Sequence, residues 1–248
     1  MDHLRHFHRE VVAFEAAARL AVGSGTAVRV PSCPDWTVSD LVFHLGSVHR
    51  LVAGVVRARL TAPPDTSATS QQQPGPVTDE LVDWFAAGAA DLEAAFREAD
   101  PTEEVWTWWY DRTVGFWIRM QTIEAAVHRW DAQASVGVPD PIPAELAADA
   151  VGQTLEIMAP ARRAMRQAPP GQGERYAFRS TDGEGAWSVC FQGATVEWTH
   201  SAQPAEVVLE GTTSELMLFL WGRVPADALH VSGDHEVLDR YFTLVPKV

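Results

Sequence analysis

A glutamate and a histidine stand four residues apart in the stretch Glu124-Ala-Ala-Val-His128-Arg-Trp-Asp131. On an α-helix this spacing places both side chains on one face, and Asp131 falls on the same side. That side also carries Trp117 and Met120, so two carboxylates and an imidazole are expected to point into apolar surroundings. Because a buried, unpaired carboxylate is strongly unfavourable, we expect a divalent metal to neutralise Glu124.

A third metal ligand is expected from a helix predicted over 38–60. His44 lies at one edge of its apolar stripe and His49 at the opposite edge. A single histidine in such a place is more often a hydrogen-bonded core residue, but the pair on the later helix needs a third partner, for which His44 is the candidate. Two histidines and a carboxylate with an open position suit catalytic Zn²⁺ and also non-haem Fe(II). Asp131 could accept the second imidazole N–H of His128.

Four amphipathic segments before residue 136 predict a helical bundle, a fold in which metal sites form from inward side chains of facing helices. Thr37 is a good N-cap for the second helix, and Asp40 stands three residues later in a capping-box-like pattern. The segment from Thr61 to Thr78 is rich in Pro, Ser, Thr and Gln and predicts a mobile linker. The predicted helices cover 3–22, 38–60, 79–99 and 113–135.

The pattern changes after a fifth helix, predicted over 145–165 with an interruption near Pro160. Pro and Gly residues in 168–174 mark a boundary, and alternating apolar residues then predict strands. The expected fold class is mainly α followed by α+β, with a bundle domain over 1–167 and a small α+β domain over 168–248. The later elements are strands at 176–179, 186–191, 195–199, 206–209 and 229–231, and helices at 213–222 and 235–242.

The composition restricts the classes of function. The formal net charge is −14, from 19 basic against 33 acidic residues, which argues against non-specific nucleic-acid binding and against anionic membranes. The N-terminus has no signal-peptide pattern, and no run of about 18 apolar residues is apparent, so a cytoplasmic protein is expected. Cys33 and Cys190 lie far apart, and in a reducing compartment we expect no disulfide between them.

An aromatic run, Val105 to Tyr110, leads into the fourth helix and contains Trp106, Trp108 and Trp109. Such aromatic residues either pack against neighbouring helices or line the mouth of a pocket beside the metal. The sequence leaves both interpretations open.

Several of these motifs together resemble the mycothiol-dependent maleylpyruvate isomerase family. They are the loop Cys33-Pro-Asp-Trp-Thr37, the following His44-Leu-Gly46, and the stretch from Glu124 to Asp131. The N-terminal domain of that family is similar to DinB-like four-helix metalloproteins, and the resemblance covers about residues 5–165. The later stretch, Val207 to Thr213 and Leu220-Trp-Gly-Arg223, resembles the family's C-terminal α+β domain, which is akin to sterol-carrier folds.

The resemblance implies that His44, Glu124 and His128 hold zinc, and that the thiol of mycothiol, an actinobacterial low-molecular-weight thiol, binds at the open position. Metal coordination lowers the pKa of a thiol and yields the nucleophilic thiolate. A thiolate that adds to an electrophilic carbon, permits rotation and then leaves catalyses cis–trans isomerisation; one that stays produces a conjugate. Arg223 matches a C-terminal arginine near the metal in the family and could bind a substrate carboxylate, or it is a surface charge after a helix.

The leading hypothesis is an enzyme that uses zinc, or another divalent metal, to activate mycothiol for attack on a small electrophile. It would act as an S-transferase or an isomerase, as a monomer or a homodimer. If the C-terminal domain docks on the open end of the bundle, Arg223 reaches the metal site and the three Trp residues wall the same cleft. The alternatives are a non-catalytic small-molecule-binding protein on the same scaffold and an Fe(II) oxygenase with the same ligands.

Overall fold

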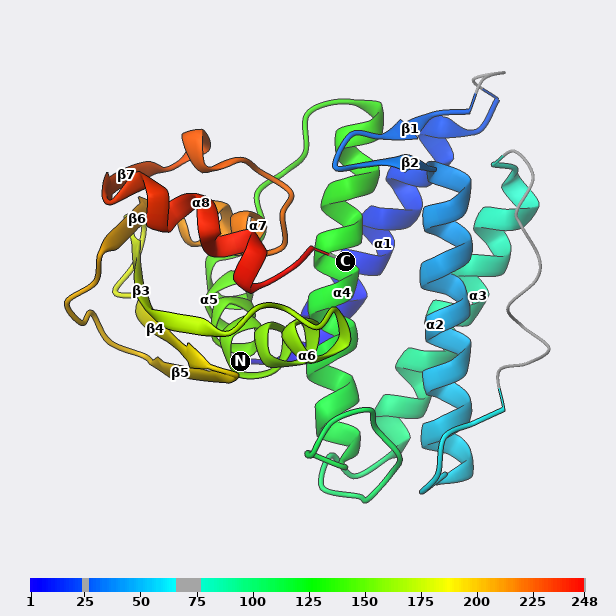
Figure 1. The fold of residues 1–248 in the computed structure, drawn as a ribbon. Coiled ribbons are helices and arrows are strands. Elements are labelled where there is room, and N and C mark those ends of the chain that lie inside the picture. Colours follow the sequence, from blue (N-terminus) through cyan, green and yellow to red (C-terminus); the bar gives the residue numbers. More distant parts are fainter. Residues whose placement is uncertain (24–26, 66–76, 248) are drawn as a thin grey trace. The chain divides into compact units, whose positions relative to one another are not determined.

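The computed structural model describes residues 1–23, 27–65 and 77–247 of the 248-residue chain. The chain forms two compact units, Met1–Asp140 and Pro141–Val248, and each is described by itself. The first unit is helical and the second contains a five-stranded sheet, so the predicted order of a mainly α part and an α+β part is confirmed (Figure 1). Most of the predicted linker, residues 66–76, lies outside the described residues.

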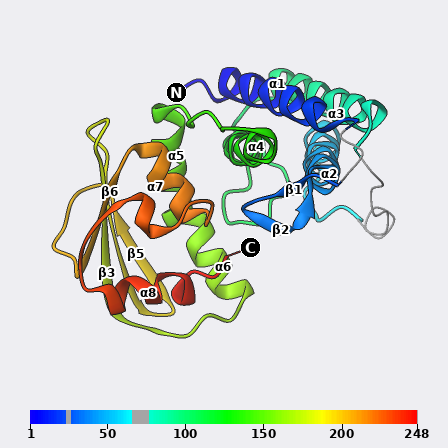
Figure 2. The same cartoon turned by 90° about the horizontal axis from the view of Figure 1, so that it is seen from above.

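The first unit is built from four long helices that pack side by side (Figure 2). Each begins at or within two residues of its predicted start, because an apolar stripe at helical spacing must be buried. Their buried stripes make one core, in which Phe14, Leu45, Phe85 and Ile123 have no exposed surface. The helices are α1 (His3–Ala21), α2 (Val38–Ala58), α3 (Asp79–Glu98) and α4 (Val114–Val136).

The predicted capping box at the start of α2 is confirmed. The Thr37 side chain accepts a hydrogen bond from the Asp40 backbone N–H, and the Asp40 carboxylate accepts one from the Thr37 N–H. The preceding segment, predicted only as a stiff loop, forms a short antiparallel hairpin of β1 (Arg29–Val30) and β2 (Cys33–Thr37). These strands were not predicted because the segment contains two Pro residues, and Pro is uncommon inside strands.

Helix α2 differs from the expectation that the chain has no apolar run long enough to cross a membrane. Among the described residues it is the one helix long and apolar enough to cross a membrane by length and composition, with a mean hydropathy of 1.2 over its best window, half of which is buried. Leu41, Leu45 and Val52 of this helix lie in the bundle core. A core helix of a bundle reaches the same hydropathy as a weak membrane span, because both must bury apolar side chains.

A buried ion pair joins α1 to α4. Arg129 donates from Nε to Glu10 at 2.8 Å, and the side chains of both residues are less than a tenth exposed. The Arg129 Nη1 group also donates to the Gln133 side chain and to the Asp140 carbonyl. A buried guanidinium needs both a counter-charge and acceptors for its N–H groups, and Arg129 has both.

The second unit begins earlier than the boundary expected from the Pro- and Gly-rich segment at 168–174. It includes α5 (Ala144–Gln153), the π-helical turn η1 (Thr154–Met158) and α6 (Ala159–Met165). Helix α5 packs on α7 (Thr213–Leu220). The Ile142 backbone N–H donates a hydrogen bond to the Ser214 hydroxyl oxygen at 2.9 Å. Helical periodicity cannot show which unit buries a helix, so sequence analysis assigned this segment to the bundle. The interruption expected near Pro160 is the π-turn.

The sheet of the second unit has the strand order β5-β4-β3-β6-β7, with β3 and β6 parallel and the other pairs antiparallel. The helices of this unit lie on one side of it (Figure 2). Inward residues alternate along the strands, as Tyr176 and Phe178 do on β3 and Trp187 and Val189 on β4, and all four are buried. The strands are β3 (Gly171–Ser180), β4 (Ala186–Gly193), β5 (Thr195–Thr199), β6 (Val207–Gly211) and β7 (His230–Gly233).

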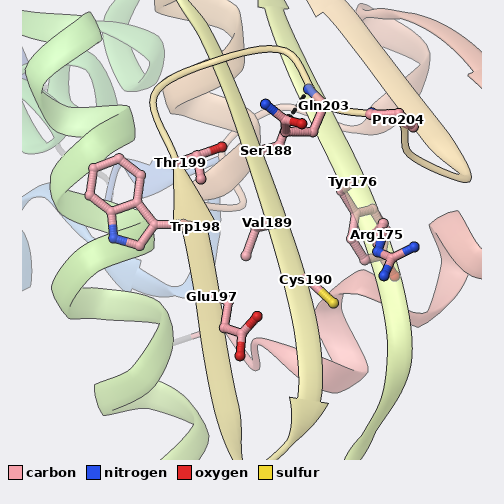
Figure 3. A pocket seen from close by; sticks show the side chains of 10 residues that line it. All are labelled: Arg175, Tyr176, Ser188, Val189, Cys190, Glu197, Trp198, Thr199, Gln203 and Pro204. Atoms are coloured by element: carbon pink, nitrogen blue, oxygen red, sulfur yellow. Dashed lines mark hydrogen bonds between the residues drawn. The ribbon is translucent and has the colours of Figure 1, made fainter.

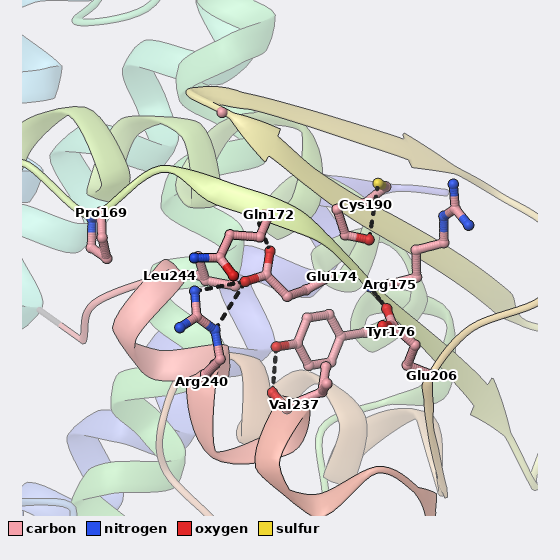
Figure 4. A network of polar contacts seen from close by, with 12 residues as sticks. Pro169, Gln172, Glu174, Arg175, Tyr176, Cys190, Glu206, Val237, Arg240 and Leu244 are labelled. Carbon is pink, nitrogen blue, oxygen red and sulfur yellow. Dashed lines mark hydrogen bonds and ion pairs between the residues drawn. The ribbon is translucent and has the colours of Figure 1, made fainter.

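Polar contacts fix the last helix, α8 (His235–Leu244), against β3 (Figure 4). Arg240 binds the Glu174 carboxylate at 2.7 Å, and the Tyr176 hydroxyl donates to the Val237 carbonyl at 2.6 Å. Arg240 and Val237 stand one and four residues before Tyr241 on α8. Their contacts with β3 therefore orient α8 so that the Tyr241 ring points into the core, where it is fully buried.

A hollow of about 340 Å³ lies on the sheet (Figure 3). Arg175, Cys190 and Glu197 stand in register across β3, β4 and β5 and contribute to its lining. Cys190 and Cys33 are both free thiols.

Candidate metal site

Helix α4 positions Glu124, His128 and Asp131. Thr113 caps its start by accepting a hydrogen bond from the Phe116 N–H at 3.2 Å, and the helix is buried around most of its circumference. The Gln121 side chain donates to Glu124 Oε2 at 2.8 Å. Burial raises the pKa of the Glu124 carboxyl, while the charge of His128 and the hydrogen bond from Gln121 act in the opposite direction. A buried carboxylate in this position favours a bound cation.

His128 is held by a chain of hydrogen bonds. Its Nδ1 lies 3.1 Å from Asp131 Oδ2, and the Ser32 hydroxyl donates to Asp131 Oδ1 at 2.6 Å. Asp131 is fully buried, so its carboxylate stabilises a proton on Nδ1, and Nε2 is then the nitrogen with a free lone pair. This is the arrangement that orients a metal-binding histidine.

Ser32 was missed by sequence analysis. It lies in the turn between β1 and β2, nearly a hundred residues from its partner Asp131. A single serine in a Pro-rich loop carries no functional signal in sequence, and only the folded hairpin brings it to α4.

His44 lies beside His128. The two ring centres are 5.3 Å apart with their planes at 82°, and the Trp36 ring packs edge-on against His44 at 5.0 Å. Two imidazoles bound tetrahedrally to one zinc ion through Zn–N bonds of about 2.0–2.1 Å have ring centres about 5 Å apart. The spacing of His44 and His128 therefore fits a shared metal ion, and the chemistry of the donor set fits as well.

The three predicted ligands do not form a complete ligand group in this structure. In the described part of the chain, no group of three or more His, Cys, Asp or Glu side chains has the geometry of a metal site. Glu124 is instead bound by Gln121. The ligand set of His44, Glu124 and His128 therefore stays a prediction, supported by the histidine pair and by the buried carboxylate.

His49 is a core residue. Its ring is fully buried between Phe7 and Phe85, at 5.3 and 5.5 Å between ring centres, and neither ring nitrogen has a hydrogen-bond partner among the described residues. Burial lowers the pKa of His49 to about 3, and the charges of His128, Arg50 and His44 act in the same direction. His49 is therefore neutral at physiological pH.

The aromatic run before α4 packs against the start of that helix. The Trp117 indole donates to the Trp106 carbonyl at 2.7 Å, and the Trp106 and Trp117 rings are 5.9 Å apart. Trp108 packs edge-on against Phe116 at 5.3 Å. These contacts favour the packing interpretation, and a role of Trp106, Trp108 and Trp109 in a pocket wall stays a prediction.

Arg223 belongs to the second unit. It follows α7 and Gly222, whose φ of 70° is in the left-handed region. Its backbone N–H donates to the Leu218 carbonyl at 2.7 Å, and its Nη1 donates to the Trp221 carbonyl at 2.9 Å. The side chain is half-buried, and its role towards a substrate carboxylate stays a prediction.

Comparison with known proteins decides the family. Residues 5–133, more than half of the chain, match the family model described as the mycothiol maleylpyruvate isomerase N-terminal domain. The chain belongs to this family. Residues 145–240 match the C-terminal domain model of the same mycothiol maleylpyruvate isomerases. The two matches leave a short gap around residue 140, where the two units meet in sequence.

Two solved structures have the same fold as this member of the mycothiol maleylpyruvate isomerase family. One is a mycothiol-dependent maleylpyruvate isomerase, with 16% identity, a TM-score of 0.62 and coverage of 94% of this chain and 93% of the other. The second is a variant of such an enzyme with one histidine replaced by alanine, with 15% identity, a TM-score of 0.61 and the same coverage. No curated protein shows a significant sequence match to this chain.

Proposed function

We propose that this chain is a metal-dependent enzyme that uses mycothiol to act on a small electrophilic substrate, as a cis–trans isomerase or an S-transferase. Family membership supports the thiol and the reaction class. One observation carries the metal: the His128 ring, oriented by Asp131 and Ser32, lies 5.3 Å from the ring of His44.

His44, Glu124 and His128 would hold the ion, and we propose zinc, which this donor set suits at a catalytic site. A bound metal would lower the pKa of a coordinated thiol, so that the thiol is present as thiolate at neutral pH. Asp131 keeps the proton of His128 on Nδ1, at 3.1 Å, so that Nε2 stays a ligand. Ser32 holds Asp131 in place. Gln121 orients the Glu124 carboxylate, whose negative charge offsets that of a cation.

Trp117 and Met120 stand on the same side of α4 and are at most 3% exposed. Apolar side chains beside a thiolate reduce its hydration and so increase its reactivity towards an electrophilic carbon. Addition of the thiol followed by bond rotation and departure of the thiol gives an isomer, whereas a retained thiol gives a conjugate. The fold is compatible with both outcomes.

The test is to incubate the purified protein with mycothiol and a panel of unsaturated electrophiles, and to identify products by mass spectrometry. The metal content is measured in parallel. An isomer or a conjugate that forms with mycothiol, and is lost on chelation and restored by zinc, supports the proposal. Absence of turnover with bound ligand would favour a non-catalytic binding protein, and activity dependent on iron and oxygen would favour an oxygenase.

For Arg223 we propose a role in binding a carboxylate of the substrate, based on its match to the family's C-terminal arginine. Loss of a charged hydrogen-bond partner should lower kcat/KM by about tenfold to a hundredfold, or about 1.5–3 kcal/mol. The experiment is Arg223→Ala, measured for zinc content and for kcat/KM separately. Unchanged turnover would remove Arg223 from the mechanism, and loss of zinc would make its role structural.

A further inference from the structure

Arg162 of α6 is a cation buried in the second unit. Its side chain is 1% exposed, and its guanidinium carbon lies 4.9 Å from the centre of the Trp221 ring. Its Nη1 donates to the Leu220 carbonyl, at the end of α7, at 3.2 Å. These two contacts satisfy one face and one edge of the guanidinium.

The other edge of the Arg162 guanidinium is unsatisfied. Nε and Nη2 are both buried and have no hydrogen-bond partner in the described part of the chain. These two N–H groups point in parallel from one side of the guanidinium, and this pair of donors matches the two oxygens of a carboxylate. The neighbouring Arg163 also has a buried Nε without a partner among the described residues, but its Nη1 and Nη2 donate to the carbonyls of Leu244 and Gly193 at 2.7 and 2.8 Å. Arg163 therefore lacks the unsatisfied pair of parallel donors that Arg162 has.

Tyr241 of α8 adds a third unsatisfied donor. Its hydroxyl is buried without a partner among the described residues, and the ring packs against Tyr176 and Phe219 at 5.1 and 5.6 Å. The contacts of α8 with β3 hold this ring in place (Figure 4). Tyr241 and Arg162 interact electrostatically, since each is among the charges that shift the pKa of the other.

The charge around Arg162 also favours an anion. The pKa of Arg162 is lowered to about 10, mainly by burial; Tyr241 acts to raise it, and the positive charge of Arg223 acts to lower it. A buried cation without a counter-charge is strongly unfavourable. Because the pKa stays well above 7, Arg162 is charged, and a bound anion would remove the imbalance.

We propose that Arg162 and Tyr241 form a binding site for the carboxylate of a small organic acid. Arg162 donates from Nε and Nη2 to the two carboxylate oxygens, and the Tyr241 hydroxyl donates to one of them. A planar carboxylate fits this three-donor set better than phosphate, whose remaining oxygens would be desolvated without partners. The proposal uses only residues of the second unit and does not depend on the proposed metal chemistry.

The test is an acetate titration of the metal-free full-length protein, with acetate replacing chloride at constant ionic strength. We expect a saturable rise in Tm with acetate, because a ligand that binds only the folded state stabilises it. Arg162→Lys removes the parallel donor pair and should weaken acetate binding at least tenfold; Tyr241→Phe should weaken it about threefold to tenfold. Arg163→Lys is the matched control, and should leave the acetate dependence unchanged whatever it does to Tm.

A second measurement covers variants that fold poorly. In the wild-type protein, the ¹⁵N NMR signal of the Arg162 Nε–H should shift saturably with acetate. Equal effects of acetate and chloride, or full acetate binding by Arg162→Lys, would overturn the proposal. A response to phosphate but not to acetate would overturn the carboxylate assignment. Because the protein is metal-free, these results are independent of turnover with mycothiol.

Discussion

Arg129 and Arg162 are both arginines with side chains at most 3% exposed, yet they have different surroundings. Arg129, in the bundle, pairs with Glu10 at 2.8 Å and also donates to Gln133 and Asp140. Arg162, in the second unit, has a carbonyl and an indole ring as partners and an unsatisfied donor edge. A buried arginine that serves stability is neutralised inside the protein, whereas one with unsatisfied donors is suited to an external anion.

The same contrast separates two histidines of the bundle. His128 is bonded to Asp131, which Ser32 holds in turn, whereas His49 is buried among aromatic rings with neither nitrogen bonded in the described residues. Oriented polar groups are found where a ligand must be positioned. His49 packs among aromatic side chains of the core, and its burial lowers the pKa of the imidazole.

The largest effect is expected from Arg129→Met, which leaves Glu10 buried and unpaired. We expect the free energy of unfolding to fall by about 3–5 kcal/mol, as measured by urea denaturation. The double variant Glu10→Leu, Arg129→Met removes both charges and should recover most of this loss. A loss of less than about 1 kcal/mol for Arg129→Met would show that the pair does not stabilise the bundle.

The second prediction concerns the chain of hydrogen bonds at His128. Asp131→Ala should lower zinc affinity by about tenfold to a hundredfold, because the imidazole loses the partner that fixes its tautomer. Competition with a chromogenic chelator measures this. Ser135→Ala is the matched control, because the Ser135 hydroxyl donates to the backbone carbonyl of Asp131 and not to its carboxylate. Equal affinities of wild type and Asp131→Ala would exclude an orienting role.

The third prediction concerns acid stability. The pKa of His49 is about 3 in the folded state, against 6.5 in the unfolded chain, so between these values only the unfolded chain binds this proton. The contribution of neutral His49 to the free energy of unfolding is therefore fully present above about pH 6.5. Below that pH it is lost by about 1.4 kcal/mol per pH unit. His49→Leu should remove that slope in urea denaturation between pH 4 and 7. The exposed His235→Leu should retain it, and an unchanged slope in His49→Leu would contradict the assignment.

The smallest effect is expected from Arg162→Met, the same substitution at the other buried arginine. In chloride buffer we expect a change of less than about 1 kcal/mol in unfolding free energy, because no buried carboxylate is left unpaired. Urea denaturation alongside Arg129→Met gives the comparison directly. A loss of several kcal/mol would mean that Arg162 is mainly structural, as Arg129 is.

Local sequence patterns predicted most of the elements and their order, although not the β1–β2 hairpin. Apolar spacing predicted the four bundle helices and the strands of the second unit, and Thr37 and Asp40 predicted a capping box that the structure confirms. These features are local: a stripe at helical spacing or a cap depends on residues a few positions apart. The motif residues from Cys33 to Asp131 also carried the family resemblance, which the family models confirm.

Contacts between side chains far apart in the sequence became visible only in the folded chain. It brought Ser32 to Asp131, His44 to within 5.3 Å of His128, and Glu10 to Arg129. It placed α5 and α6 with the second unit and left a donor edge of Arg162 without a partner. Periodicity along one helix says which side is buried but not what lies opposite, because partners across a core come from segments whose separation in sequence carries no signal.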